Sequence, residues 1–219
     1  MAKLNKMDIE NIRVDYQKHE LIEDDLYKDP IEQFSYWFKD ALDAEVLEPN
    51  AMTLATATKE GIPSARIVLL KSFDEKGFSF YTNYLSKKGK ELAKNPFGAI
   101  LFFWPELQRQ VRIEGKIVKL SKEESEKYFH SRPYESQIGA ISSPQSQVIP
   151  NKQSLETIFK NLLTKYKKGD TIPKPAHWGG YILHPISIEF WQGRPNRLHD
   201  RIKFSLMEKN KWKIERLAP

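Results

Sequence analysis

Short apolar runs separated by turn-forming residues recur along this sequence, and they restrict its fold more than any other feature. Residues 52–58 and 64–72 flank the turn-forming residues 59–63, which predicts a β-hairpin. Further strands are predicted over residues 78–83, 97–104, 108–120, 178–183, 186–192, 202–208 and 211–217. The sequence has no strand–helix–strand alternation with the glycine-rich loop of a doubly wound dinucleotide-binding fold. We therefore expect a mainly antiparallel β-barrel with peripheral α-helices.

Apolar residues at helical spacing predict helices between these strands. The predicted helices span residues 30–45, 87–94, 122–131 and 154–167. Asp29, Ser121 and Ser154 are suited to cap three of them. Residues 139–150 are rich in Ser, Pro and Gln, which predicts a loop. The run Ile67–Leu70 is apolar at every position, so we expect a strand that is buried on both faces.

Length and composition limit the other possibilities. The chain has 219 residues, and we expect residues 1–28 to be a mobile N-terminal segment and residues 29–219 to form a single domain. Cysteine is absent and the five histidines lack metal-ligand spacing, so neither disulfides nor a metal site is predicted. No run approaches the roughly 18 apolar residues of a membrane helix. The N-terminus lacks an apolar signal core, and we expect a cytoplasmic protein with no membrane partner.

The formal net charge of +6 favours anionic partners, either nucleic acid or phosphorylated small molecules. Nucleic-acid binders usually carry a basic stripe or a known module. Here the basic residues are interleaved with apolar ones inside predicted strands and near helix starts, which favours discrete phosphate sites and no nucleic-acid partner. Lys87 and Lys88 lie in the first turn of a predicted helix, where free N–H groups also suit a phosphate, although most lysine pairs are merely solvated.

Residues 191–201, Trp-Gln-Gly-Arg-Pro-Asn-Arg-Leu-His-Asp-Arg, place one indole, three guanidinium groups and one imidazole within eleven residues. In an extended segment Arg197, His199 and Arg201 would project to the same side. The residues of this segment alone leave two interpretations open. One is a solvated basic edge strand that prevents aggregation, and the other is a pocket for an anionic, planar ligand.

Several segments together carry a resemblance to one enzyme family. They are Arg66-Ile-Val-Leu-Leu-Lys71, Phe80-Tyr-Thr-Asn83, Ser86-Lys-Lys-Gly89, Arg109-Gln-Val-Arg-Ile-Glu-Gly115, residues 128–139, Gln145-Ser146, residues 190–201 and Glu215-Arg-Leu-Ala-Pro219. In this order they resemble the pyridoxine (pyridoxamine) 5'-phosphate oxidases, FMN enzymes of vitamin B6 metabolism. The resemblance implies an FMN-binding split β-barrel that forms a homodimer, with FMN at the subunit interface. It also implies oxidation of pyridoxamine or pyridoxine 5'-phosphate to pyridoxal 5'-phosphate by dioxygen, which yields hydrogen peroxide and, from the amine, ammonia.

The resemblance assigns one group of residues to FMN. These are Arg66, Ile67, Val68, Leu69, Leu70, Lys71, Tyr81, Thr82, Lys87, Lys88, Gln110, Gln145, Ser146, Trp191 and Arg201. Arg66 and Lys88 would supply charge-assisted hydrogen bonds to the phosphate of FMN. Gln110 and Gln145 would bond the polar edge of the flavin, and Trp191 would cover it with apolar surface.

The resemblance assigns a second group to the substrate. These are Arg13, Tyr16, Lys71, Tyr128, Arg132, Ser136, Arg197 and His199. Arg197 and His199 would be the catalytic pair that orients the pyridine ring, and Arg13 and Tyr16 would fold over the bound substrate as a lid. The alternative is a non-catalytic protein that binds FMN or pyridoxal phosphate on the same barrel. Such a protein would not need this second group.

Overall fold

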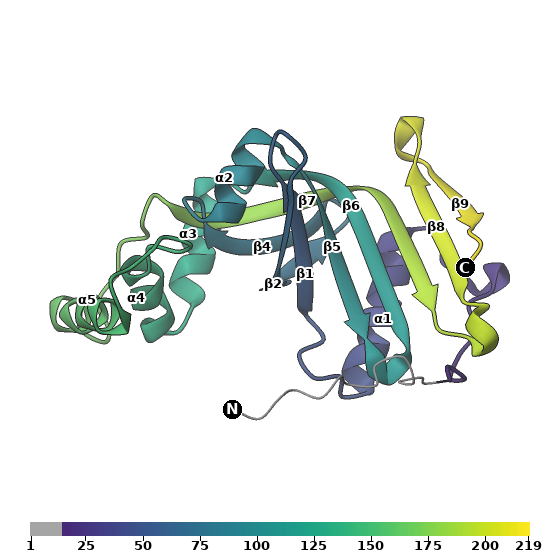
Figure 1. The fold of residues 1–219 in the computed structure, drawn as a ribbon, viewed down its shortest axis with the longest axis horizontal. Coiled ribbons are helices and arrows are strands. Elements are labelled where there is room, and N and C mark those ends of the chain that lie inside the picture. Colours follow the sequence, from purple (N-terminus) through teal and green to yellow (C-terminus); the bar gives the residue numbers. More distant parts are fainter. Residues whose placement is uncertain (1–14) are drawn as a thin grey trace, which may run out of the picture.

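The computed structural model describes residues 15–219, and a nine-stranded antiparallel sheet forms its centre (Figure 1). Hydrogen-bonded neighbours follow the order β2-β1-β5-β6-β7-β4-β3, and β8 pairs with both β7 and β9. The strands are β1 (Ala51–Ala57), β2 (Pro63–Leu69), β3 (Ser72–Asp74), β4 (Gly77–Asn83), β5 (Phe97–Trp104), β6 (Arg109–Lys119), β7 (Trp178–Gln192), β8 (Asp200–Leu206) and β9 (Trp212–Arg216). The predicted antiparallel fold class is therefore confirmed.

The long strand β7 joins the two ends of the sheet, because its first half pairs with β4 and its second half pairs with β8. The prediction of two separate strands in this region was wrong. Pro185 lies inside β7, and β6 accommodates it through a register shift between Glu114 and Gly115. A Cβ atom on Gly115 would lie 2.0 Å from the carbonyl oxygen of His184, so only glycine allows the strands to approach here.

Helix α1 (Pro30–Asp43) covers one face of the sheet and supplies much of the core. It starts as predicted, with the Asp29 carboxylate accepting a hydrogen bond from the Ile31 N–H at 2.7 Å, and it ends two residues before the predicted end at residue 45. The ring of Phe34 is fully buried, with its centroid 4.9 Å from that of Phe78 and 5.1 Å from that of Phe102. Burial of this aromatic cluster fixes α1 against β4 and β5.

The opposite face of the sheet is open where β2, β1 and β5 lie side by side. Ile67 is 65% exposed and Leu69 is 36% exposed, so the prediction that this run is buried on both faces was wrong for the single chain. The reason is topological, because β2 is an edge strand and α1 covers only the other face. Phe103, on β5, is also 53% exposed on the open face.

The remaining helices are α2 (Lys87–Lys94), α3 (Lys122–Ser131), α4 (Tyr134–Ser142) and α5 (Lys152–Lys165). Figure 1 shows α3, α4 and α5 gathered at one end of the sheet, opposite β8 and β9. There Phe129, Ile138 and Trp178 form a second apolar cluster. Among residues 15–219, the helices are too short or too polar to cross a lipid bilayer.

Two local predictions in this region need correction. Helix α4 was not predicted, and its last residues, 139–142, were expected to belong to a loop. Pro133 follows the predicted helix over residues 122–131 and is typical of a helix end, but here it occupies the N-cap position of α4, where a missing N–H costs nothing. Helix α5 is capped by Asn151 instead of Ser154, and Asn151 Oδ1 accepts from the Ser154 N–H at 2.9 Å.

Candidate functional site

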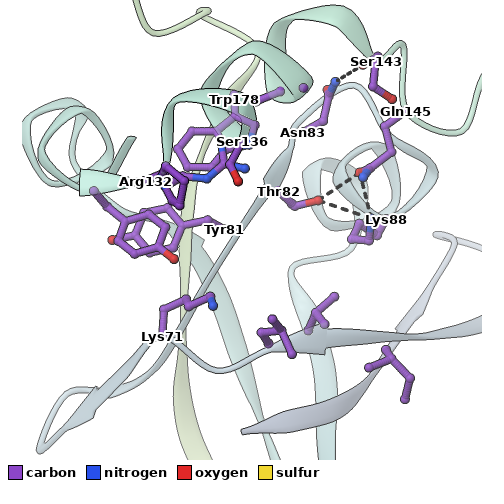
Figure 2. A pocket seen from close by; sticks show the side chains of 17 residues that line it. Lys71, Tyr81, Thr82, Asn83, Lys88, Arg132, Ser136, Ser143, Gln145 and Trp178 are labelled. Carbon is purple, nitrogen blue, oxygen red and sulfur yellow. Dashed lines mark hydrogen bonds between the residues drawn. The ribbon is translucent and has the colours of Figure 1, made fainter. Parts of the chain in front are cut away.

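A cavity of about 620 Å³ lies between the open edge of the sheet and helices α2, α3 and α4 (Figure 2). Its volume falls within the range of small-molecule sites. Eleven of the residues predicted to bind FMN or substrate line it: Ile67, Val68, Leu69, Lys71, Tyr81, Thr82, Lys88, Tyr128, Arg132, Ser136 and Gln145. Residues from both predicted groups therefore meet in one space, although they come from five different parts of the chain.

At one end of the cavity, Lys88 projects from the first turn of α2 and is only 8% exposed. Its Nζ donates to Gln145 Oε1 at 3.0 Å and to Thr82 Oγ1 at 3.2 Å, so both partners are neutral. Burial lowers the pKa of Lys88, and the positive charge of Arg66 lowers it further against the opposing effect of Glu91. An ammonium group held in this way is stabilised by any anion that enters the cavity.

Arg66 stands behind this end of the cavity and does not line it. Its guanidinium donates to Thr56 Oγ1 and Ser64 Oγ, both at 2.5 Å, and lies 3.5 Å from a carboxylate oxygen of Glu91. Burial alone would raise the pKa of Glu91, but hydrogen bonds from Thr56 and Ser64 and the charge of Arg66 lower it. The Glu91 carboxylate therefore stays ionised and orients Arg66 beside Lys88.

At the other end of the cavity, Arg132 follows the last turn of α3 and stacks over Trp178, with 4.7 Å from its Cζ atom to the ring centroid. Its Nη1 is buried and has no hydrogen-bond partner among residues 15–219. Burial lowers the pKa of this guanidinium, although it stays charged at any ordinary pH. A buried, unpaired donor of this kind is expensive unless a ligand supplies an acceptor.

Three more predicted substrate residues surround Arg132. The ring of Tyr128 stacks on that of Tyr81 with 3.8 Å between centroids, while Lys71 and Ser136 complete the lining (Figure 2). Among residues 15–219, neither Lys71, Lys88 nor Arg132 forms an ion pair with a carboxylate. The cavity thus offers two separate cationic ends, and the apolar side chains of Ile67, Val68 and Leu69 also line it. This arrangement suits two phosphate-bearing ligands with flat, apolar parts.

A second group of predicted residues lies away from this cavity, at the other end of the open face. Gln110 pairs with Trp191, and Trp191 pairs with Arg201, so the three form one row across β6, β7 and β8. Paired residues on adjacent strands project to the same face. Arg201 Nε donates to the buried carboxylate of Glu189 at 2.8 Å, and Arg112 donates to the same carboxylate. Glu189 therefore fixes Arg201 on this row.

His199 lies beside the row, with its ring centroid 4.7 Å from that of Trp191. Its Nδ1 accepts a hydrogen bond from the Arg194 backbone N–H at 3.1 Å, which places the proton of the neutral ring on Nε2. Burial lowers the pKa of His199, and the charge of Arg197 lowers it further against Asp200. The geometry therefore favours a neutral imidazole that can donate from Nε2.

The prediction that residues 197, 199 and 201 share one side of an extended segment was wrong. Asn196 and Arg197 have φ values of 57° and 61°, so the chain turns before β8 begins at Asp200. His199 and Arg201 consequently face different partners, the former the Arg194 N–H and the latter Glu189.

The other predicted residues have separate positions. Leu70 is buried in the main core, Lys87 is exposed with its Nζ 3.9 Å from Glu91, and Ser146 is exposed with a φ of 69°. Tyr16 contacts Trp191 and His199, whereas Arg13 lies outside the described residues.

Sequence reasoning missed six residues that line the cavity: Asn83, Pro133, Gly139, Ala140, Ser143 and Trp178. Asn83 directly follows the predicted residue Thr82 in β4. The other five residues reach the cavity only because of the way in which α3, α4 and β7 pack together, and sequence spacing does not reveal that packing.

Comparison with known proteins supports one family over almost the whole chain. A family model described as pyridoxamine 5'-phosphate oxidase matches residues 38–166, and one described as the pyridoxine 5'-phosphate oxidase C-terminal dimerisation region matches residues 178–219. A pyridoxine/pyridoxamine 5'-phosphate oxidase of Salinibacter ruber is 53% identical over 95% of this chain and 98% of its own. A chloroplastic enzyme of that name from Arabidopsis thaliana is 51% identical over 100% of this chain and 42% of its own.

Solved structures agree with these matches. The structure of PhzG from Burkholderia lata, in complex with tetrahydrophenazine-1-carboxylic acid, superposes with a TM-score of 0.85 and 33% identity, over 91% of this chain and 98% of that one. An FMN-binding protein from Nostoc punctiforme shares the fold with a TM-score of 0.68 and 16% identity, over 89% of this chain and 100% of that one. The chain belongs to the pyridoxamine 5'-phosphate oxidase family.

Proposed function

We propose that this protein oxidises pyridoxamine 5'-phosphate and pyridoxine 5'-phosphate to pyridoxal 5'-phosphate, with FMN as cofactor and dioxygen as final acceptor. The observation that carries the proposal is the pair of cationic ends in one cavity, Lys88 at one and Arg132 at the other. Among residues 15–219, neither Lys88 nor Arg132 forms an ion pair with a carboxylate, and the apolar side chains of Ile67 and Leu69 also line the cavity. One phosphate from the cofactor and one from the substrate would satisfy both ends.

The residues at the Lys88 end fit the phosphate of FMN. Lys88 and Thr82 supply donors at the cavity surface, and Arg66 adds positive charge from behind. Held by these residues, FMN would supply the redox chemistry: a hydride acceptor for the C4' carbon of the substrate and a two-electron donor to dioxygen, which would form hydrogen peroxide with the hydride hydrogen and the proton lost by the substrate's hydroxyl or amine group. The amine substrate would in addition consume water and release ammonia.

The residues at the Arg132 end fit the phosphate of the substrate. Arg132 Nη1 is a buried donor that needs an acceptor, and Lys71 and Ser136 add a second charge and a hydroxyl group. Arg197 and His199 would orient the pyridine ring. In this role His199 donates a hydrogen bond from Nε2 to a substrate oxygen, because its Nδ1 is already occupied by the Arg194 N–H.

The proposal includes a homodimer in which each site draws on both subunits. Ile67, Leu69 and Phe103 give the open face an exposed apolar surface, which is unusual for a monomer. The same face carries the row formed by Gln110, Trp191 and Arg201. Two copies packed through this face would bring the row of one copy toward the cavity of the other. The match of residues 178–219 to a dimerisation region supports this arrangement.

An anaerobic titration tests the function. The purified protein is loaded with FMN, pyridoxamine 5'-phosphate is added without oxygen, and the visible absorption band of oxidised flavin is followed. We expect the band to bleach, and air should restore it with formation of pyridoxal 5'-phosphate and hydrogen peroxide. A protein that binds FMN but never bleaches would be a non-catalytic flavin carrier, and one that binds no FMN would contradict the proposal entirely.

A further inference from the structure

Residues 16–23, here called the strap, lie beside β8 and β9 (Figure 1), and side chains from distant parts of the chain hold their backbone at three points. In the middle of the strap, Arg194 Nη1 donates to the His19 carbonyl at 3.0 Å, and the other two points lie on either side of it. The first point is Gln108, a buried residue in the tight turn between β5 and β6 with a φ of 55°. Its Oε1 accepts hydrogen bonds from the backbone N–H groups of Gln17 at 3.0 Å and Lys18 at 3.3 Å.

The second point involves Asp200 and Arg216, which together bind both backbone polar groups of Leu21. Asp200 Oδ2 accepts from the Leu21 N–H at 3.1 Å, and Arg216 Nη2 donates to the Leu21 carbonyl at 2.8 Å. Arg216 Nη1 also donates to Asp200 Oδ1 at 2.7 Å. The same guanidinium forms a two-pronged ion pair with Glu23 at 2.6 and 2.8 Å, which fixes its orientation.

These anchors determine where Tyr16 lies. Its ring centroid is 5.8 Å from that of Trp191, edge to face, and 5.9 Å from that of His199. Gly193 provides the space, because a Cβ atom there would lie 2.7 Å from Tyr16 Cγ and 2.9 Å from Tyr16 Cβ. Atoms so close to the backbone cannot swing away as the tip of a long side chain can. Any larger residue at position 193 would therefore displace Tyr16.

We propose that Gln108, Asp200 and Arg216 are positioning residues, which hold the strap so that Tyr16 stays against His199 and Trp191. The inference rests on the proposed function, in which His199 orients the substrate ring. None of the three needs to touch the substrate. Their effect is to fix Tyr16 beforehand, so that binding does not have to bear the entropy of ordering residues 16–23.

Hydrogen exchange tests the anchoring without any measurement of activity. In Arg216→Gln we expect faster exchange of the amide of Leu21, and in Gln108→Leu faster exchange of the amides of Gln17 and Lys18. The matched control is Lys213→Gln, which removes an ion pair with Glu215 on the same strand, β9, and leaves the strap contacts intact. Unchanged protection of the strap amides in both anchor variants would overturn the proposal.

Kinetics then test the consequence for the site. We expect Arg216→Gln to raise KM for pyridoxamine 5'-phosphate about three- to tenfold, the range of a partly exposed ion-pair network, with kcat and FMN affinity close to wild type. In a Tyr16→Ala background the same substitution should have no further effect, since the residue that it positions is gone. Gly193→Ala should reproduce the rise in KM.

Two kinetic results would contradict the proposal. One is an equal rise in KM with and without Tyr16, which would mean that Arg216 acts on the site by another route. The other is a loss of FMN affinity in Arg216→Gln, which would mean that the ion pairs support the fold as a whole. If the wild-type protein shows no oxidase activity, the proposed function fails, and hydrogen exchange still decides whether the strap is anchored as described.

Discussion

The ammonium group of Lys88 lies 3.0 Å from Gln145 Oε1, and the two residues are 57 positions apart in the chain. Thr82 donates to the same oxygen at 3.0 Å. The three side chains therefore form a small polar cluster in which the only full charge is the buried ammonium. Such a cluster gains stability when an anion arrives, and this property leads to the first prediction.

Replacement of Lys88 by Met should weaken FMN binding and leave the apo-protein at least as stable as wild type. The loss of charge-assisted hydrogen bonds to a phosphate corresponds to roughly a tenfold to hundredfold lower affinity. The apo-protein should not be destabilised, because the variant removes an ammonium group that burial disfavours. Fluorescence titration with FMN and thermal melting of the apo-protein measure the two effects. Lys90→Met, an exposed change in the same helix, is the control, and equal FMN affinity in both variants would refute the assignment.

Replacement of Arg132 by Ala should remove the preference for a phosphorylated substrate. Its unpaired Nη1 is the buried donor at this end of the cavity, so the variant should lower kcat/KM for pyridoxamine 5'-phosphate by about tenfold or more. It should hardly change kcat/KM for pyridoxamine, which has no phosphate, and FMN affinity should be retained. Lys127→Ala, an exposed change in α3, is the control. If both substrates lost activity by the same factor, Arg132 would not be a phosphate ligand.

The parts of the fold that could be predicted are those with a local cause. The starts of α1 and α3 follow from Asp29 and from the Ser121–Glu124 capping box, since these contacts lie within a few residues of each other. The exposure of Ile67 could not be predicted, because it depends on which strand forms the edge of the sheet and on α1 covering only one face. Helix α4 was missed because Pro133 fits both the end of one helix and the start of the next.

In the candidate site, too, contacts within one element could be predicted from the sequence, whereas contacts between strands could not. The resemblance to the family assigned Lys71, Tyr128 and Arg132 to the substrate, and in the structure all three line one cavity. Tyr128 lies in α3 and Arg132 directly follows that helix, so their spacing of four residues could indicate in advance that the two side chains lie close together. The link between Glu189 and Arg201 could not, because it depends on the pairing of β7 with β8. Sequence spacing identifies residues that are neighbours along one helix or strand. Contacts between adjacent strands can be predicted only when the pairing register of the two strands is known.

The activity should fall as the pH drops through the pKa of His199. Because burial and Arg197 lower this pKa below the ordinary value of 6.5, the inflection should lie below 6.5. Protonation would place a hydrogen on Nδ1, facing the Arg194 N–H, and would break that hydrogen bond. The folded pKa is lower than the unfolded one, so the stability contributed by neutral His199 is present above pH 6.5 and is lost as the pH falls through the folded pKa.

The pH dependence of kcat/KM and an NMR titration of the His199 ring measure this pKa. Arg197→Gln removes one cause of the lowering, so the ring of His199 should titrate at a higher pH in that variant. The NMR titration is informative even if the variant turns over slowly. An unchanged titration in Arg197→Gln would show that the charge of Arg197 does not act on His199.

Glu189→Gln should destabilise the fold and loosen Arg201. The carboxylate is 3% exposed and accepts hydrogen bonds from both Arg112 and Arg201. Its neutralisation leaves Arg201 without this counter-charge and leaves Arg112 with only its exposed pair to Glu114 at 3.4 Å. Breaking a buried ion pair costs about 3–5 kcal/mol, and the partial exposure of both arginines should reduce this to about 2–3 kcal/mol. Urea unfolding measures the change. Glu215→Gln, in the exposed pair with Lys213, should change stability by less than about 1 kcal/mol.

Phe103→Glu should convert the proposed homodimer to a monomer that binds FMN weakly. Phe103 is 53% exposed on the open face and pairs with Gln110, next to the row of predicted cofactor residues. If this face joins two copies, the variant buries a carboxylate without a partner in an apolar interface, which is unfavourable by several kcal/mol. Leu42→Glu, 54% exposed on α1 at the opposite face, is the control and should remain dimeric. Sedimentation velocity gives the mass of each species, and a Phe103→Glu protein that stays dimeric with unchanged FMN affinity would place the interface elsewhere.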